Sequence, residues 1–172
     1  YGQSGNPHNF YVDGSPTVGD VCNAQCKAAS DWKTILVGGL RAGGQGIYAL
    51  NITDPSAFSE ANALSLVMWE FNDKQDTDLG YTFSRPVIAR VCTSRDSSSK
   101  SSPKACGAGE WVVIFGNGYN NTEADGAASA TGEAVLYVVN ALTGELIKKI
   151  STKTGLTATP NGLATPAAAD ID

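Results

Sequence analysis

The segments GSPTVGDV (residues 14–21), FSRPVIARV (83–91) and LATPAAADI (163–171) each place a proline at the start of a short run of small and β-branched residues. The three prolines, Pro16, Pro86 and Pro166, stand 70 and 80 residues apart. Self-similarity at a regular spacing is typical of repeat architectures. The sequence therefore predicts two complete repeats, at about 10–80 and 81–160, and the start of a third at 161–172.

Each complete repeat continues through three more segments of the same kind. An apolar run opens on a tryptophan and ends in glycine, as WKTILVGG from Trp32 and WVVIFGNG from Trp111. An aromatic segment follows around Tyr48 or Tyr137, and LVMWEF or ELIKKI closes the repeat. Short runs of β-branched, aliphatic and aromatic residues bounded by Gly, Pro, Asn or Asp predict strands. Helical periodicity is weak, and only SAFSEANALSLV after Pro55 is expected to form a turn of helix.

Four strands per repeat predict an all-β fold. We expect a partial β-propeller with about two four-stranded antiparallel blades plus the first strand of a third. A two-sheet sandwich could use the same number of strands, but it would not explain why the same order of segments occurs twice and begins again. Because the chain starts at Tyr1 rather than at a methionine, we expect residues 1–172 to be a fragment of one propeller domain.

Composition and net charge argue against nucleic acid as a binding partner and against a membrane-spanning segment. The chain has 12 basic and 17 acidic residues and a net charge of −5. Surfaces that bind nucleic acid are normally basic, so we expect no nucleic-acid partner. No apolar run approaches the roughly 18 residues of a membrane helix, so we expect no membrane span. The 42% of hydrophobic residues is sufficient for a packed core.

The four cysteines, Cys22, Cys26, Cys92 and Cys106, allow three disulfide connectivities. Pairing Cys22 with Cys26 and Cys92 with Cys106 is the natural partition, because each pair closes a short polar loop that cannot order itself by burying apolar surface. Disulfides indicate an oxidising compartment. A zinc site is the alternative, but His8 is the only histidine of the chain and the spacing is not that of a zinc knuckle.

An acidic loop and a basic pair offer further candidates. Asp73, Asp76 and Asp78 lie close together in DKQDTDLG and could hold a cation, although the spacing fits no dedicated metal loop and favours a solvated loop. Lys148 and Lys149 are interpreted as a solvated strand end.

Two further features favour structure over ligand binding. Trp32 and Trp111 stand at equivalent positions in the two repeats, which favours packing between blades over ligand stacking. The glycine-rich LRAGGQGIY connects strand to strand and lacks the Lys-Ser/Thr of a phosphate loop, so we interpret it as a flexible hairpin.

Three long segments carry a family resemblance. The chain from about residue 10 to 172, and most specifically VDGSPTVGD, GGLRAGGQGIYALNITDP and DLGYTFSRPVIAR, resembles the C-terminal propeller of the PilY/PilC family of proteins linked to bacterial type IV pili. The resemblance implies a non-enzymatic, exported binding and assembly module within an adhesin of pilus biogenesis and surface attachment. The implied location is the cell surface, the pilus tip, or the outer membrane and periplasm. The implied partners are minor pilins or the tip complex, a host or surface receptor, and the remaining blades of the same propeller.

The same resemblance implies a calcium site in the intact parent. In that family the segment PAAADID continues into a calcium loop, in which Asp170 and Asp172 would supply the first and third ligand positions. Two carboxylates cannot complete a shell of 6 to 8 oxygens, so calcium is not expected to be held by this fragment alone.

Two alternatives remain from other classes of protein. LYVVNALTGELI also resembles the strand–turn–strand repeats of quinoprotein (PQQ-type) dehydrogenases, which makes a fragment of a periplasmic oxidoreductase the first alternative. Such a cofactor needs a complete set of binding groups that two blades do not provide. With His8 as the only histidine, no catalytic triad is expected. The second alternative is an extracellular structural propeller without a role in pili.

Overall fold

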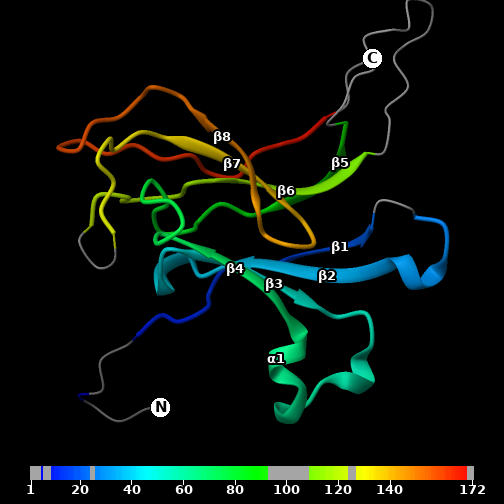
Figure 1. Ribbon diagram of the computed structural model, residues 1–172. Coiled ribbons are helices and arrows are strands. Elements are labelled where there is room, and N and C mark those ends of the chain that lie inside the picture. The colour runs from blue at the N-terminus through cyan, green and yellow to red at the C-terminus, as the bar shows by residue number, and fades with distance from the viewer. Residues whose placement is uncertain (1–4, 6–8, 24–25, 93–108, 124–126, 170–172) are drawn as a thin grey trace, which may run out of the picture.

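The protein folds as two four-stranded antiparallel sheets, which lie one above the other in Figure 1. The computed structural model describes residues 5, 9–23, 26–92, 109–123 and 127–169. In the first sheet the strands follow the chain in the order β1 (Thr17–Cys22), β2 (Trp32–Gly39), β3 (Gly46–Asn51) and β4 (Val67–Asn72). In the second sheet the order is β5 (Val87–Val91), β6 (Glu110–Gly116), β7 (Val135–Asn140) and β8 (Leu146–Ser151). The all-β expectation and the count of strands per repeat are confirmed.

The helical segments are short and lie mainly in one connection. The four-residue helix α1 (Ala63–Leu66) precedes β4, as the sequence predicts, and projects away from the second sheet in Figure 1. The remaining turns are 3-10 segments: η1 (Ala29–Asp31), η2 (Arg41–Gly43), η3 (Pro55–Ala57) and η4 (Glu60–Asn62). Segment η2 lies in the tight link between β2 and β3, which confirms the hairpin reading of the glycine-rich loop. No helix in the described ranges is long and apolar enough to cross a membrane.

The two sheets repeat each other down to their irregularities. Thr17 pairs with Val37 in the first sheet and Val87 pairs with Ile114 in the second. The register between the third and fourth strands shifts between Ala49 and Leu50, and again between Val138 and Val139. These two shifts occupy matching positions in the two sheets, so the sequence repeat corresponds to a structural repeat.

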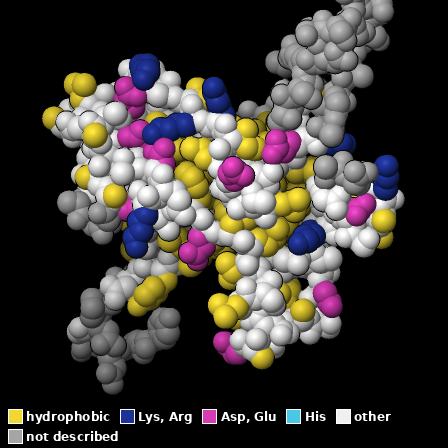
Figure 2. All heavy atoms as spheres, in the orientation of Figure 1, with side chains coloured by type: hydrophobic (Ala, Val, Ile, Leu, Met, Phe, Trp, Pro, Cys, Tyr) yellow, Lys and Arg dark blue, Asp and Glu magenta, His cyan; other side chains and the backbone are white. Residues whose placement is uncertain are grey.

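The core lies between the sheets, and strand alternation builds it. Along β7 the side chains of Val135, Tyr137 and Val139 are buried while their neighbours in the chain are half-buried. Ile35 and Val37 of β2 belong to the same buried cluster. Because successive side chains of a strand point to opposite faces, one face of each sheet is committed to this contact. Figure 2 shows hydrophobic side chains gathered in the middle of the visible side of the molecule, with charged side chains spread around them.

Three aromatic rings form the centre of this core. Phe71 of β4 lies 5.8 Å from Phe115 of β6 and 5.4 Å from Tyr137 of β7, between ring centroids. Phe115 and Tyr137 are themselves 5.4 Å apart. Aromatic rings at these separations add to the free energy of burial. The contact between the sheets therefore contains a cluster of buried aromatic rings.

The pairing of Trp32 and Trp111 confirms one prediction and corrects another. The rings meet across the two sheets with centroids 6.1 Å apart, so these residues pack between the repeats as expected. Their positions are not equivalent, however. Val37 corresponds to Ile114 in the ladders, and counting back from there matches Trp111 with Thr34 rather than with Trp32. The offset is two residues, which a sequence alignment anchored on the tryptophans does not reveal.

The segment after the second sheet is extended but forms no strand over residues 161–169. Leu163 O accepts a hydrogen bond of 3.0 Å from Gly118 N, and Leu163 N donates one of 3.0 Å to Asn117 Oδ1. A strand requires a continuous ladder with a partner, and no strand of the described residues pairs with this segment. The assignment of 161–172 to a further blade therefore stays a prediction.

Candidate functional site

Several predicted site residues fall outside the described residues. Asp170 and Asp172, the expected calcium ligands, lie there, as do Cys106 and His8. In the part of the chain that the structure describes, no group of three or more His, Cys, Asp or Glu side chains is arranged to hold a metal ion. The calcium site thus stays a prediction.

The acidic loop after β4 is a buried cluster and not the solvated loop that the sequence favours. Asp73 and Asp78 are only 9% and 7% exposed. The cation that pairs with two of these side chains is Lys149 of β8, whose Nζ lies 2.7 Å from Asp76 Oδ1 and 2.7 Å from Asp78 Oδ2. Lys149 is therefore not a solvated strand end, because its ammonium group joins the second sheet to the loop that leaves the first.

Hydrogen bonds satisfy the remaining oxygens of this cluster. Asp78 Oδ1 accepts hydrogen bonds from the hydroxyl groups of Ser129 and Thr131, the latter at 2.9 Å. Asp76 Oδ1 accepts another from the hydroxyl of Tyr137 at 2.9 Å. A metal ion would have to displace Lys149 and these donors, so Asp76 and Asp78 do not fit a cation site. The less favoured alternative for this loop, a cation held by protein oxygens, thus gives way to an internal ion pair with Lys149.

The electrostatics of the cluster follow from these contacts. Burial works to raise the pKa of Asp78, but hydrogen bonds from Lys149, Ser129 and Thr131 outweigh it and hold that pKa below its usual value. Burial works to lower the pKa of Lys149, and its bonds to Asp76 and Asp78 outweigh this and raise it. Burial, followed by the charge of Asp76, raises the pKa of the Tyr137 hydroxyl far above its usual value. At neutral pH these directions keep Asp78 and Lys149 charged and the phenol of Tyr137 neutral.

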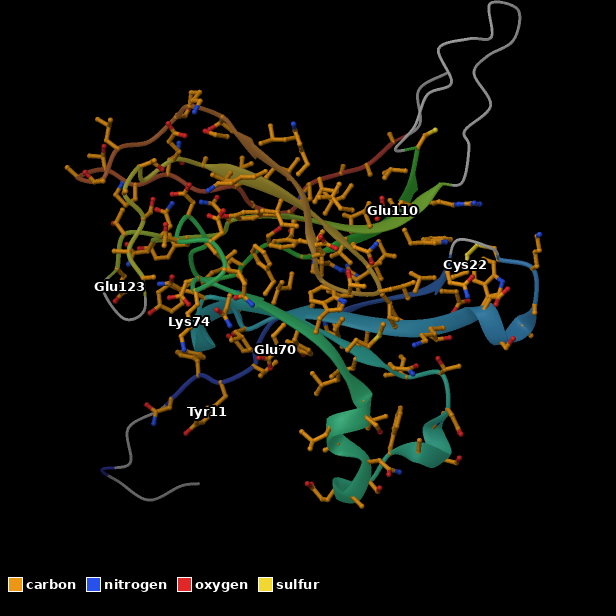
Figure 3. All side chains as sticks on the ribbon, in the orientation of Figure 1. Tyr11, Cys22, Glu70, Lys74, Glu110 and Glu123 are labelled. Carbon is orange, nitrogen blue, oxygen red and sulfur yellow. A yellow bond between two sulfur atoms is a disulfide. The ribbon has the colours of Figure 1, made fainter. Side chains whose placement is uncertain are left out.

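The predicted pairing of Cys22 with Cys26 is present. The disulfide joins residues whose Cα atoms are 5.4 Å apart, and Figure 3 shows it at the end of the first sheet opposite to Tyr11. Trp111 Nε1 donates a hydrogen bond of 3.0 Å to Cys22 Sγ, so the disulfide loop also contacts the second sheet. The other expected pair, Cys92 with Cys106, includes a residue outside the described ranges and stays a prediction.

A cavity of about 320 Å³ opens at the other end of the two sheets. It is lined by residues of the segment before β1, of the end of β2 and the β2–β3 link, and of the β4–β5 connection: Gly14, Ser15, Gly39, Arg41, Thr82, Phe83, Ser84 and Arg85. Two of these side chains are cationic and three carry hydroxyl groups. The cavity lies between the two repeats and receives residues from both sides of their contact.

Hydrogen bonds of two alternate residues in the β4–β5 connection, Thr82 and Ser84, hold the backbone around the cavity. Thr82 and Ser84 are each 2% exposed. Thr82 Oγ1 donates to Gly46 O at 2.6 Å and accepts from Arg41 N at 3.2 Å, while Ser84 Oγ accepts from Gly116 N at 2.9 Å. Because alternate residues of an extended chain point to opposite sides, Phe83 and Arg85 are directed outward.

Sequence reasoning missed both the ion pair and this cavity. Lys149 and Asp76 are 73 positions apart, and no local pattern connects them. A partial signal existed for the cavity, because FSR before Pro86 alternates a buried hydroxyl with exposed aromatic and cationic residues. The arginine at 41 carried no signal, since its role depends on a hairpin meeting a distant connection.

Comparison with known proteins gives one consistent result. A family model of the PilY1 β-propeller domain matches residues 1–172. A type IV pilus biogenesis factor PilY1 homolog of Xylella fastidiosa is 38% identical over 87% of the chain, and PilY1 of Pseudomonas aeruginosa is 36% identical over 98%. The chain spans only 8% and 12% of the lengths of these two relatives.

A solved structure supports the same fold. The crystal structure of the P. aeruginosa PilY1 C-terminal domain superposes with a TM-score of 0.64 at 36% identity, covering 94% of this chain and 26% of that one. The two sheets described above are therefore comparable with part of a larger β-propeller domain.

Proposed function

Because the chain belongs to the PilY1 β-propeller family, we propose that it forms consecutive blades in the propeller of a type IV pilus biogenesis factor. In this role it is a non-enzymatic, exported binding and assembly module that takes part in surface attachment. Family membership favours this function over a quinoprotein dehydrogenase or a structural propeller without a role in pili. The observation that carries the proposal is the match of the family model to the whole chain.

The two outer faces support a place within a larger propeller. Tyr137 and Tyr48 hold matching positions on their third strands, since Phe115 pairs with one as Gly38 pairs with the other. Tyr137 is fully buried against the first blade (β1–β4), whereas Tyr48 is half-buried. Tyr48 therefore lies on the face of the first blade that a preceding blade would cover.

The second blade (β5–β8) shows the complementary case. Asn72 pairs with Gly46 as Ser151 pairs with Val135, so Ile150 of β8 matches Phe71 of β4. Phe71 is 3% exposed, but Ile150 is 46% exposed. We propose that further blades of the same propeller cover both faces. These blades are the first partners of this chain. Minor pilins or the tip complex, and a host or surface receptor, are the partners of the whole protein.

Calcium belongs to the same proposal. We propose that Asp170 and Asp172 provide the first two ligands of a calcium loop in the intact protein, on the support of the DID pattern and the family resemblance. Calcium titration of the full protein by calorimetry tests this. Asp170→Asn with Asp172→Asn should remove one binding event, and an unchanged titration would argue against the loop.

A genetic experiment tests the function. Deletion of the gene in its source bacterium should reduce the number of surface pili, and a plasmid copy should restore it. Attachment to a surface is then measured in strains matched for pilus number, which separates adhesion from assembly. Normal piliation and normal attachment in the deletion strain would contradict the proposal.

A further inference from the structure

The cavity between the β2–β3 link and the β4–β5 connection carries an inference that does not depend on a role in pili. We propose that it binds an acidic side chain of a partner peptide, whose carboxylate lies between Arg41 and Arg85. Arginine pairs with a carboxylate through two parallel hydrogen bonds, and two arginines in one cavity provide donors for both oxygens.

The two guanidinium groups are available for such a ligand. Among the described residues, neither Arg41 nor Arg85 takes part in an ion pair, and every ion pair there is made by Lys149 or Lys153. Within the described part of the chain, the guanidinium of Arg85 forms one hydrogen bond, from its Nε to Thr17 Oγ1 at 3.3 Å. Asp13 lies nearby and accepts a hydrogen bond from Ala42 N at 3.1 Å, but it does not line the cavity. Two cations thus share one cavity in a protein whose net charge is −5.

The position of Arg41 is built into the fold. Its backbone has a φ of 55°, a conformation that costs about 1 kcal/mol for a residue with a side chain. Its N–H is held by Thr82, and its guanidinium carbon lies 5.0 Å from the centre of the Phe83 ring. A stacked arginine keeps its donors in a fixed plane, so less entropy is lost when a carboxylate binds.

The rim favours a peptide over an acidic sugar. Phe83 and Tyr119 form an edge-to-face pair with centroids 6.3 Å apart, and they are 44% and 66% exposed. The hydroxyls of Thr82 and Ser84 already have backbone partners, which leaves few groups for the many hydroxyls of a sugar. An acidic residue flanked by apolar residues matches this combination of two cations and exposed aromatic rings.

The test uses the full protein and a blocked tripeptide, acetyl-Gly-Glu-Gly-amide, observed by ligand NMR titration. The glutamine peptide is the neutral control. We expect the glutamate peptide to bind and the glutamine peptide to bind at least about tenfold more weakly, because a hydrogen bond to a charged group is lost. Equal binding of the two peptides would overturn the proposal.

Variants locate the site. Arg41→Gln should weaken binding of the glutamate peptide at least about tenfold, and Arg41→Lys should weaken it less, because it keeps the charge but not the paired hydrogen bonds. Arg90→Gln is the matched control, since Arg90 is exposed on β5 and does not line the cavity. An unchanged melting temperature of Arg41→Gln shows that the variant is folded. Loss of binding in Arg90→Gln, or retention in Arg41→Gln, would overturn the site.

Two competing ligands complete the test. If galacturonate binds with the same dependence on Arg41 and the peptide does not, the cavity is a site for acidic sugars and the peptide proposal is wrong. Binding of inorganic phosphate without binding of the peptide would overturn it in the same way. Displacement of the bound glutamate peptide by an acetyl-aspartate peptide, but not by its asparagine counterpart, would support it.

Discussion

Trp111 of the second blade donates its indole N–H to Cys22 of the first blade, over 3.0 Å from Nε1 to Sγ. The same indole meets Trp32 edge to face, with planes inclined at 69°. One side chain thus contacts both the disulfide loop and the strand that follows it. At this end of the blades the contact depends on aromatic packing, whereas further along it depends on the ion pair of Lys149.

Trp111→Ala should lower the free energy of unfolding by about 3 kcal/mol, because it removes a large ring packed against the core and leaves a cavity. Urea unfolding followed by circular dichroism measures the change. Trp32→Ala is the control, since Trp32 is already 38% exposed and should cost about 1 kcal/mol. Equal losses for the two variants would show that Trp111 has no special role in joining the blades.

Lys149→Met should destabilise the protein by about 2 kcal/mol, because Asp76 and Asp78 would be left without their cation in a largely buried site. The lysine side chain is 33% exposed, so the loss is smaller than for a fully buried pair. Thermal unfolding at pH 7 provides the measurement. Lys148→Met, one position away on the exposed side of β8, should change stability by less than about 0.5 kcal/mol.

The sequence predicted those parts of the fold that local patterns encode. Strand signatures and the spacing of Pro16 and Pro86 were sufficient for two four-stranded units. The loop closed by Cys22 and Cys26 was predictable because the pair is separated by four positions. Hairpin strands pair with their neighbours in the chain, so a reading along the chain finds them.

Contacts between the blades were not predictable in the same way. Lys149 reaches Asp76 only because two sheets stack, and a doublet of lysines at a strand end is usually solvated. The equivalence of Trp32 and Trp111 was wrong by two residues, because Trp32 pairs with Cys22 at the end of its ladder whereas Trp111 pairs with Arg90 inside its own. The position of Arg41 in the cavity depends on Thr82, whose hydroxyl meets a hairpin from the other repeat.

The protein should lose stability at acid pH because Asp78 becomes protonated. Its pKa is lower in the folded protein than in the unfolded chain, so its contribution is complete well above the unfolded value of about 3.9 and is lost as the pH falls through the folded pKa. The melting temperature should therefore drop as the pH falls below about 4. Asp78→Asn should melt lower at pH 7 and depend less on pH in the acid range. Parallel acid profiles for the two proteins would contradict this assignment.

At alkaline pH the change of stability with pH depends on Tyr137 and Lys149, whose pKa values are both raised by folding. The unfolded chain loses these protons near pH 10 while the folded protein keeps them, so stability falls as the pH rises above about 10. Tyr137→Phe should cost about 1 kcal/mol at pH 7 through the lost hydrogen bond to Asp76. Its melting temperature should then fall less steeply than that of the unaltered protein between about pH 9 and 11. An equally steep fall in the two proteins would show that Tyr137 loses its proton as readily in the folded state as in the unfolded chain.

Gly144→Ala tests how closely the β7–β8 turn fits the first blade. Gly144 has a φ of +72°, and a Cβ atom there would lie 2.7 Å from Cγ of Trp69. The methyl group therefore adds backbone strain and pushes the indole away from Ala141, whose carbonyl accepts a hydrogen bond of 2.9 Å from Trp69 Nε1. We expect a loss of about 3 kcal/mol in the free energy of unfolding. We also expect a red shift of tryptophan fluorescence, because Trp69 becomes more exposed to water. Glu145→Ala, which truncates an exposed side chain in the same turn, should leave both measurements nearly unchanged. If the Gly144→Ala variant melts at the same temperature as the unaltered protein, the turn moves away from Trp69 without cost. The close packing of this turn would then contribute nothing to joining the blades.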